Sequence, residues 1–518
     1  MLRNMLCCIG GEQSPNRTNS NNTVLNTIPN IKNGKLHDQN FKHLHAACLT
    51  RGTLYQDLEF PPTNKSLYFS KDPPCDIEWR RASEISKNAQ FFVDGPSRFD
   101  INQGQLGDCW LLAAISSLAM KKDLLYKVVH ADQSFNKNYA GIFHFSFYQY
   151  GKWVDVVVDD YLPTHKGSLV YMKSKPENEF WASLLEKAYA KLNGSYEALE
   201  GGMMGEALTD LTGGVSELFS LKTPDCPSNL FQIMLDAYKY EFMMGCSILG
   251  SSSNKIKRLG LLSGHAYTIT KVICANVTPS RGYKTVCLVR IRNPWGKKEW
   301  RGRWSDGSPE WMNISDIEKQ RIGLTFDDKD GEFYMTFDDF KKYFTHMEMC
   351  NPLYEVDMEV IRHDFRIQEF KGSWIQRQNA GGCRNFAKTF ATNPQFRIRI
   401  KKEDDGDAAN FRTIVVSLMQ KGRRGMREDG LGNLKIGFEV YHILNPALNR
   451  SPLNSEFFRN KRPEQCFGNS KEFDDLREIV GRYRLYPGSY VIVPSTYAPG
   501  KDGDFFLRIL SQKDIVVE

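Results

Sequence analysis

The sequence predicts an α+β core of two lobes followed by an antiparallel β-sandwich, and three observations support this fold class. An apolar helix begins at Cys109, and a glycine turn opens a β-strand at His265. Short alternating strands then fill the chain beyond about residue 351. A chain of 518 residues is too long for one hydrophobic core, and this length suggests about three domains.

The composition divides the chain into four segments. Residues 1–40 are rich in Asn, Ser, Thr, Gly and Lys and lack periodicity, so we expect a disordered tail, most clearly over Asn16–Asn33. Residues 41–213 alternate helical and extended patterns up to the Gly213-Gly214 break, which marks the join to a second lobe at 214–350. Residues 351–518 form the predicted sandwich domain.

Several local elements are clear within the first two lobes. Phe143–Tyr150 and Lys152–Asp159 alternate in polarity on either side of Gly151, which predicts a β-hairpin. Leu184–Leu192 places its apolar residues on one helical face, and a further helix is expected over 228–241. Helices packed against strands are typical of an α+β core.

The sandwich is predicted by strands of alternating polarity between turn residues. Turns are marked by Tyr486-Pro487-Gly488 and by Pro499-Gly500-Lys501-Asp502-Gly503. The clearest strands are Phe396–Ile400, Thr413–Leu418, Ile436–Ile443, Tyr490–Val493 and Phe505–Leu510.

Cys109 follows a glycine turn and opens the apolar run Trp110–Leu118. A thiol at a helix N-terminus lies at the positive end of the helix dipole, which favours the thiolate. The thiolate is the nucleophilic form, so this is a suitable position for a catalytic cysteine. Taken alone, a buried structural cysteine explains Cys109 equally well.

Two later segments favour catalysis. His265 opens a β-branched and aromatic strand, and the strand Val286–Arg292 ends at Asn293. A histidine can hold the proton of a thiol, and a side-chain amide can orient the imidazole. The order Cys, then His roughly 150 residues later, then Asn suits a papain-like site. The amide of Gln103, six positions before Cys109, can bind an oxyanion beside the Cys109 N–H.

These motifs closely resemble the protease core of the calpain family, and the resemblance runs from about Phe41 to the C-terminus. It implies a calcium-dependent intracellular cysteine endopeptidase with Cys109, His265 and Asn293 as its triad and Gln103 in the oxyanion hole. It also implies that Trp295 shifts between blocking and shielding the site. The segments that carry it are Gln103–Leu112, Asn138–Phe145, Glu179–Tyr189, Gly264–Tyr267 and Arg292–Gly296.

The same resemblance implies two calcium ions in the core, one in each lobe, which would bring the halves of the site together. Acidic turns alone are more often solvated loops, and no EF-hand pattern occurs. The first ion would take carbonyls of Val93 and Gly95 and carboxylates of Asp100 and Glu179. The second would take carboxylates of Glu299, Asp306, Asp330 and Glu332 and the carbonyl of Asp328.

Conventional calpains continue into a penta-EF-hand domain, which is missing here, so we expect an atypical or truncated member and consider a small-subunit heterodimer unlikely. The net charge of +7 is modest and no base-stacking motif accompanies it, so we expect no nucleic-acid partner. The 12 cysteines lack metal-binding spacing, and no signal peptide or membrane span is recognisable, which favours a cytoplasmic protein. Acylation of Cys7 and Cys8, or the sandwich, would allow peripheral membrane contact, although an incidental thiol pair is the simpler interpretation.

The function predicted from these observations is limited cleavage of cytoskeletal or signalling proteins by a calcium-regulated cysteine endopeptidase. One alternative is a non-proteolytic scaffold with the same fold, but retention of Cys109, His265 and Asn293 speaks against it. Another is a calcium-dependent transglutaminase, which also forms a thioester but normally pairs its histidine with an aspartate.

Overall fold

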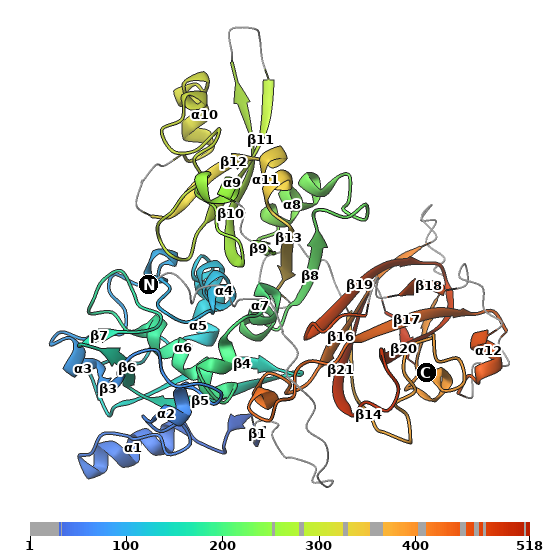
Figure 1. Ribbon diagram of the computed structural model, residues 1–518, viewed down its shortest axis with the longest axis horizontal. Coiled ribbons are helices and arrows are strands. Elements are labelled where there is room, and N and C mark those ends of the chain that lie inside the picture. Colours follow the sequence, from blue (N-terminus) through green and yellow to red (C-terminus); the bar gives the residue numbers. More distant parts are fainter. Residues whose placement is uncertain are drawn as a thin grey trace. The chain divides into compact units, whose positions relative to one another are not determined.

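A computed structural model describes residues 31–32, 34–250, 254–278, 284–324, 330–352, 366–401, 411–445, 452–459, 466–469, 473–511 and 514–517. The chain divides into two compact units, Met1–Tyr354 and Glu355–Glu518 (Figure 1). The first unit holds both predicted lobes, and the second holds the predicted sandwich. Cys7, Cys8 and Asp328 lie outside the described residues.

The first lobe contains a buried helix and two small sheets, whose strand orders are β1-β2-β5-β4 and β3-β6-β7. Its strands are β1 (Ile31–Lys32), β2 (Lys35–Leu36), β3 (Glu78–Arg81), β4 (Ile142–Gln149), β5 (Lys152–Asp159), β6 (Tyr161–His165) and β7 (Ser168–Leu169). Its helices are α1 (Phe41–Arg51), α2 (Asn64–Leu67), α3 (Ala82–Ile85), η1 (Arg98–Asp100), α4 (Cys109–Ala119), α5 (Lys122–Val128), α6 (Trp181–Leu192), η2 (Glu197–Leu199) and α7 (Met204–Thr212).

The predicted β-hairpin is confirmed, because β4 and β5 pair antiparallel with Gln149 opposite Lys152. The predicted disorder up to residue 40 is wrong at its end. Lys35 pairs parallel with Asp155 of β5, and Leu36 is fully buried in the core of this lobe. Burial of Leu36, the pairing of Lys35 and the hydrogen bonds of Gln39 to Tyr55 and Asp57 hold this short polar segment, whose composition gives no such signal.

Helix α4 owes its position to its composition. All eleven residues from Cys109 to Ala119 are buried, so this helix lies inside the unit and not on its surface. It packs against α7 on one side and against the sheet of the second lobe on another. Thr268 of that sheet donates a hydrogen bond to the carbonyl of Ala113 at 2.8 Å. This contact fixes α4 against the strand that carries His265.

The second lobe is built on one sheet with strand order β12-β11-β10-β9-β13-β8. Its strands are β8 (Val215–Ser220), β9 (Met243–Ile248), β10 (His265–Val277), β11 (Lys284–Arg292), β12 (Glu332–Thr336) and β13 (His346–Asn351). Its helices are α8 (Leu230–Lys239), α9 (Asn254–Arg258), η3 (Pro309–Asn313), α10 (Asp316–Arg321) and α11 (Phe337–Tyr343). Each pairing in this sheet is antiparallel, and β10 and β11 form its long hairpin (Figure 1).

The second unit confirms the predicted antiparallel sandwich. Its sheets have strand orders β14-β21-β16-β19 and β18-β17-β20-β15-β22. Trp374 and Ile414 of one sheet share a core with Ile398 and Phe438 of the other. Its elements are β14 (Arg366–Trp374), η4 (Phe390–Thr392), β15 (Phe396–Ile400), β16 (Arg412–Gln420), η5 (Gly425–Arg427), β17 (Ile436–Ile443), α12 (Ser455–Arg459), β18 (Cys466–Asn469), β19 (Glu478–Leu485), β20 (Gly488–Thr496), β21 (Gly503–Ser511) and β22 (Val516–Val517).

Candidate active site

Cys109 is the first residue of α4, and Asp108 is its N-cap. The carbonyl of Asp108 accepts the first hydrogen bonds of the helix, from the N–H groups of Leu111 and Leu112. The Cys109 side chain is 5% exposed. Its sulfur therefore lies at the positive end of a buried helix dipole, where water screens little of the field.

His265 and Asn293 are brought together by the sheet. His265 begins β10, Asn293 follows the end of β11, and these two strands are neighbours in antiparallel register. The Nε2 atom of His265 lies 2.8 Å from Oδ1 of Asn293. Both side chains are buried.

The surroundings of Asn293 assign the proton on the imidazole. Its Nδ2 donates to the carbonyls of Lys297 at 2.8 Å and Lys298 at 3.0 Å, so its Oδ1 must be the atom that faces His265. An amide oxygen only accepts, and Nε2 of His265 is therefore the protonated nitrogen. In the neutral ring, Nδ1 is left as the atom that can accept a proton.

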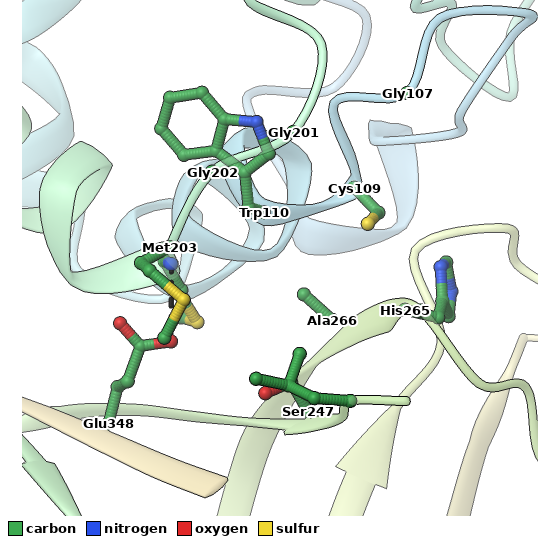
Figure 2. Close-up of a pocket in the computed structure, with 13 residues that line it drawn as sticks. Gly107, Cys109, Trp110, Gly201, Gly202, Met203, Ser247, His265, Ala266 and Glu348 are labelled. Carbon is green, nitrogen blue, oxygen red and sulfur yellow. Dashed lines mark hydrogen bonds between the residues drawn. The ribbon is translucent and has the colours of Figure 1, made fainter. Parts of the chain in front are cut away.

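Cys109 and His265 line the same cleft between the two lobes. Figure 2 shows the Cys109 sulfur and the His265 ring on two sides of this cleft. Gly201, Gly202 and Met203 contribute the wall on the side of the first lobe. The sequence-predicted nucleophile and base thus face one space, although 156 positions separate them in the chain.

Burial, with a smaller contribution from the nearby Lys298, lowers the pKa of His265 to about 4, against the opposing effect of the hydrogen bond to Asn293. The imidazole ring is enclosed by Tyr267 and Trp295, whose ring centroids lie 4.8 and 5.1 Å away. His265 is therefore neutral near pH 7 in this conformation, which is the form that can accept a proton.

Gln103 is held in a fixed orientation. Its Nε2 donates to the carbonyl of Leu106 at 2.7 Å, and its Oε1 accepts from the indole of Trp295 at 2.7 Å. The amide nitrogen carries a second N–H, which is not used in either of these two bonds. Gly104 is required beside it, because a Cβ there would lie 2.2 Å from the carbonyl oxygen of Val170.

Trp295 covers the His265–Asn293 pair. Its backbone N–H donates to Oδ1 of Asn293 at 3.0 Å, and Lys298 lies over its indole ring. Together with its bond to Gln103, these contacts hold the indole beside the His265–Asn293 pair.

Two carboxylates of the first expected calcium set, Asp100 and Glu179, lie near each other in the first lobe. Oε1 of Glu179 accepts the N–H of Val93 at 2.6 Å, while its Oε2 is buried without a hydrogen-bond partner. Burial, with a smaller contribution from the adjacent Asp100 carboxylate, raises the pKa of Glu179 to about 7, against the opposing effect of the hydrogen bond from Val93. Asp94 and Gly95 both have left-handed backbone angles, so the loop beside these carboxylates turns sharply. Two buried carboxylates with an unpartnered oxygen suit a hard cation.

The second expected set is only partly described. Oε1 of Glu299 accepts the N–H of Gly331 at 3.1 Å, and Asp330 accepts the N–H of Glu332 at 2.7 Å. These contacts place Glu299 beside the 330–332 segment. Asp306 lies in the turn before η3.

Glu332 differs from the role expected for it. Its two carboxylate oxygens accept from Arg98 at 2.8 and 3.1 Å, and Arg290 lies 3.4 Å away. Burial raises the pKa of Glu332, but the two arginines outweigh this effect and hold the pKa below its usual range. The carboxylate is thus committed to an ion pair that joins the two lobes, because guanidinium groups occupy both oxygens.

Sequence reasoning missed Arg98 and two other groups near the cleft. Glu348 of β13 accepts the N–H groups of Met204 and Gly205 at the start of α7, at 3.2 and 2.6 Å. Asp108 is fully buried, and burial raises its pKa to about 7. Of these three residues, only Asp108 could have been singled out from the sequence, because it lies beside the candidate nucleophile. The partners of Arg98 and Glu348 are more than 140 residues away along the chain.

Comparisons with known proteins identify the class to which this geometry belongs. Residues 55–351 match the family described as calpain family cysteine protease, and residues 370–510 match calpain large subunit, domain III. The chain belongs to the calpain family.

Three relatives illustrate the similarity. The chain is 48% identical over 482 residues to Calpain-A of Drosophila melanogaster, with 92% of this chain and 57% of that protein covered. It is 47% identical over 482 residues to Calpain clp-1 of Caenorhabditis elegans, covering 91% and 60%, and 44% identical over 481 residues to Calpain-9 of Homo sapiens, covering 92% and 68%. The chain thus spans little more than half the length of the first two. Within the part of the chain that the structure describes, no helix is long and apolar enough to cross a membrane.

Proposed function

We propose that this chain is a calcium-regulated cysteine endopeptidase that makes limited cuts in proteins. The observation that carries the proposal is the His265–Asn293 hydrogen bond of 2.8 Å in the cleft that Cys109 lines. Because this bond uses Nε2 of His265, Nδ1 of the neutral imidazole is the atom that can accept the proton of the thiol. This arrangement supports the proposal that Cys109 acts as nucleophile, His265 as base and Asn293 as the orienting amide.

The proposed reaction uses these three residues in sequence. His265 takes the thiol proton, and the Cys109 sulfur attacks the carbonyl carbon of the scissile peptide bond. His265 then returns the proton to the leaving amine as the C–N bond breaks, which leaves a thioester on Cys109. Water, deprotonated by His265, attacks the thioester, and the thiol is restored as the acid product leaves. Asn293 holds the imidazole tautomer throughout.

The tetrahedral intermediates place negative charge on the former carbonyl oxygen. The backbone N–H of Cys109, at the start of α4, and the second N–H of the Gln103 amide are the proposed donors to this oxygen. Trp295 supports this arrangement, because its indole holds the other end of the same amide.

Calcium is proposed to control the assembly of the site. In the first lobe, Asp100 and Glu179 would bind the ion with the carbonyls of Val93 and Gly95, and the unpartnered Oε2 of Glu179 supports this assignment. When bound, calcium supplies positive charge that neutralises this buried pair and orders the loop around it. In the second lobe, Glu299, Asp306 and Asp330 are the proposed carboxylates.

Proteins of the cytoplasm, cytoskeletal or signalling ones among them, are the proposed substrates, since the family of cysteine proteases to which the chain belongs acts on proteins. Contact with membranes through Cys7 and Cys8 or through the sandwich also stays a proposal.

The test is cleavage of casein by the purified chain over a calcium titration. We expect cleavage that depends on calcium, is lost in Cys109→Ala and persists in Cys75→Ala, a half-buried cysteine outside the cleft. Cleavage without calcium would contradict the proposed control, and cleavage by Cys109→Ala would contradict the proposed nucleophile. Incorporation of a primary amine into casein without cleavage would identify a transglutaminase instead.

A further inference from the structure

Two cysteines that the proposed chemistry does not use face each other in the second lobe. Cys274 of β10 and Cys287 of β11 are direct partners in the antiparallel register. Directly opposite residues place their side chains on the same face of a sheet. Among the strand pairs of the described residues, this is the one register that sets cysteine against cysteine.

The backbone hydrogen bonds show whether Cys274 and Cys287 form a hydrogen-bonded or a non-hydrogen-bonded pair of the antiparallel ladder. The carbonyl of Cys274 accepts from Arg321 at 2.7 Å, and two residues later the N–H of Asn276 donates to Glu318, also at 2.7 Å. Both bonds leave the sheet toward α10, away from β11. Because the N–H and C=O of one residue point to the same side of an antiparallel strand, Cys274 and Cys287 form a non-hydrogen-bonded pair.

This geometry brings the two sulfur atoms within bonding range. The Cα atoms of a non-hydrogen-bonded pair lie about 4.5 Å apart, which is at the lower end of the range that a disulfide spans. Burial first, and then the neighbouring Cys274 thiol, raise the pKa of Cys287 to about 11, in keeping with two adjacent side chains on one face of the sheet. Both residues are half-buried and reduced, so a small oxidant can reach them.

The charges around the pair favour one order of reaction. The guanidinium of Arg321 donates to the Cys274 carbonyl and therefore lies beside Cys274. The same guanidinium also pairs with Glu318. The negative charge of Asp338 acts on Cys287. An anionic neighbour disfavours the thiolate of Cys287, so we assign Cys287 as the second thiol to react and Cys274 as the first.

We propose that Cys274 and Cys287 are a reversible dithiol–disulfide site, oxidised by a peroxide and reduced by a thiol. The Cys274 thiolate attacks one oxygen of hydrogen peroxide, the O–O bond breaks, and the released hydroxide leaves as water after taking a proton. The Cys287 sulfur then attacks the resulting sulfenic acid, the S–S bond forms, and the second water leaves with the remaining thiol proton. Two thiols are oxidised by two electrons, and one peroxide is reduced to two waters.

The bond would tie together the far half of the β10–β11 hairpin. Cys274 lies nine residues along β10 from His265, or about 30 Å at the rise of an extended strand. The oxidised pair therefore does not touch the cleft, and its effect falls on the stability of the second lobe. This inference is independent of the proposed protease activity.

The experiment is peptide mapping without reduction on the full chain carrying Cys109→Ser, which prevents self-cleavage and oxidation of the cleft thiol. After treatment with hydrogen peroxide, we expect one linked pair of peptides containing Cys274 and Cys287, lighter by two hydrogens. Dithiothreitol should separate the pair. Cys287→Ser should abolish the link, whereas Cys75→Ser, a matched half-buried cysteine, should leave it unchanged.

The outcomes separate the proposal from its alternatives. Two reduced peptides after peroxide, a sulfinic acid at Cys274, or a link from Cys274 to another cysteine would each overturn it. A second measurement compares thermal unfolding of the oxidised and reduced chains. We expect the oxidised chain to have a higher midpoint temperature of unfolding than the reduced chain, and this difference should disappear in Cys287→Ser. Equal midpoint temperatures would contradict stabilisation of the hairpin by the proposed disulfide.

Discussion

Glu348 gives a prediction whose size follows from the structure. This carboxylate is buried at the start of α7, and burial raises its pKa to about 7 despite hydrogen bonds from Gly205 and Met204. The folded state therefore holds the proton more tightly than the unfolded state, in which the ordinary pKa is 4.5. As the pH rises from about 4.5 through 7, the unfolded state loses its proton first and the free energy of unfolding falls.

The magnitude can be worked from the two pKa values. Each pH unit between them corresponds to about 1.4 kcal/mol, so ionised Glu348 lowers the stability at pH 8 by about 3 kcal/mol. Glu348→Gln removes this charge but can keep only one of the two N–H bonds, at a cost of about 1 kcal/mol. We expect the variant to be about 2 kcal/mol more stable at pH 8 and no more stable than the parent at pH 5.

The assay is urea unfolding of the protease core in EDTA at pH 5 and pH 8, in the Cys109→Ser background. Glu177→Gln, at an exposed glutamate of the same unit, is the control and should leave the stability unchanged at both pH values. A Glu348→Gln variant destabilised equally at both pH values would refute the reasoning. That result would mean that the N-terminus of α7 holds the carboxylate ionised in the fold.

The remaining predictions concern the cleft and the contact between the lobes. Asn293→Ala should lower kcat for casein about 100-fold with little change in KM, because His265 loses the 2.8 Å bond that fixes its tautomer; equal kcat values would contradict this role. Arg98→Ala should lower the free energy of unfolding by about 2 kcal/mol in urea, because Glu332 loses a two-bonded partner, and Arg98→Lys should recover only part of this loss. Gly104→Ala should lower kcat even under conditions in which the variant stays folded, because the new Cβ meets two backbone carbonyl oxygens at 2.2 and 2.3 Å and displaces the turn. An unchanged kcat would exclude a positioning role for this turn.

The sequence predicted features that depend on local pattern. The apolar run after Cys109 indicated a buried helix, and α4 is buried along its whole length. The alternation around Gly151 indicated a hairpin, and the strands of the second unit were recognisable from their turns. The order of Cys109, His265 and Asn293 suggested one site, because strand ends and helix N-termini meet at clefts in such folds.

Features that depend on distant partners were not predictable. The bonds that orient the Gln103 amide, to the carbonyl of Leu106 and from the indole of Trp295, involve residues that the sequence did not connect with it in this role. Glu332 was expected to bind calcium through its carboxylate, whereas Arg98, 234 residues earlier, holds both oxygens. No periodicity or spacing records such a pairing, since it arises only when the two lobes pack.

The most direct test of the account is the rate at which iodoacetamide alkylates Cys109, followed by peptide mass spectrometry across pH with calcium present. If Cys109, His265 and Asn293 act as one unit, the wild-type thiol reacts rapidly well below pH 8.5, and His265→Ala slows it and moves its profile toward that of an ordinary thiol. Wild-type and His265→Ala profiles that coincide, both rising only near pH 8.5, would contradict the account.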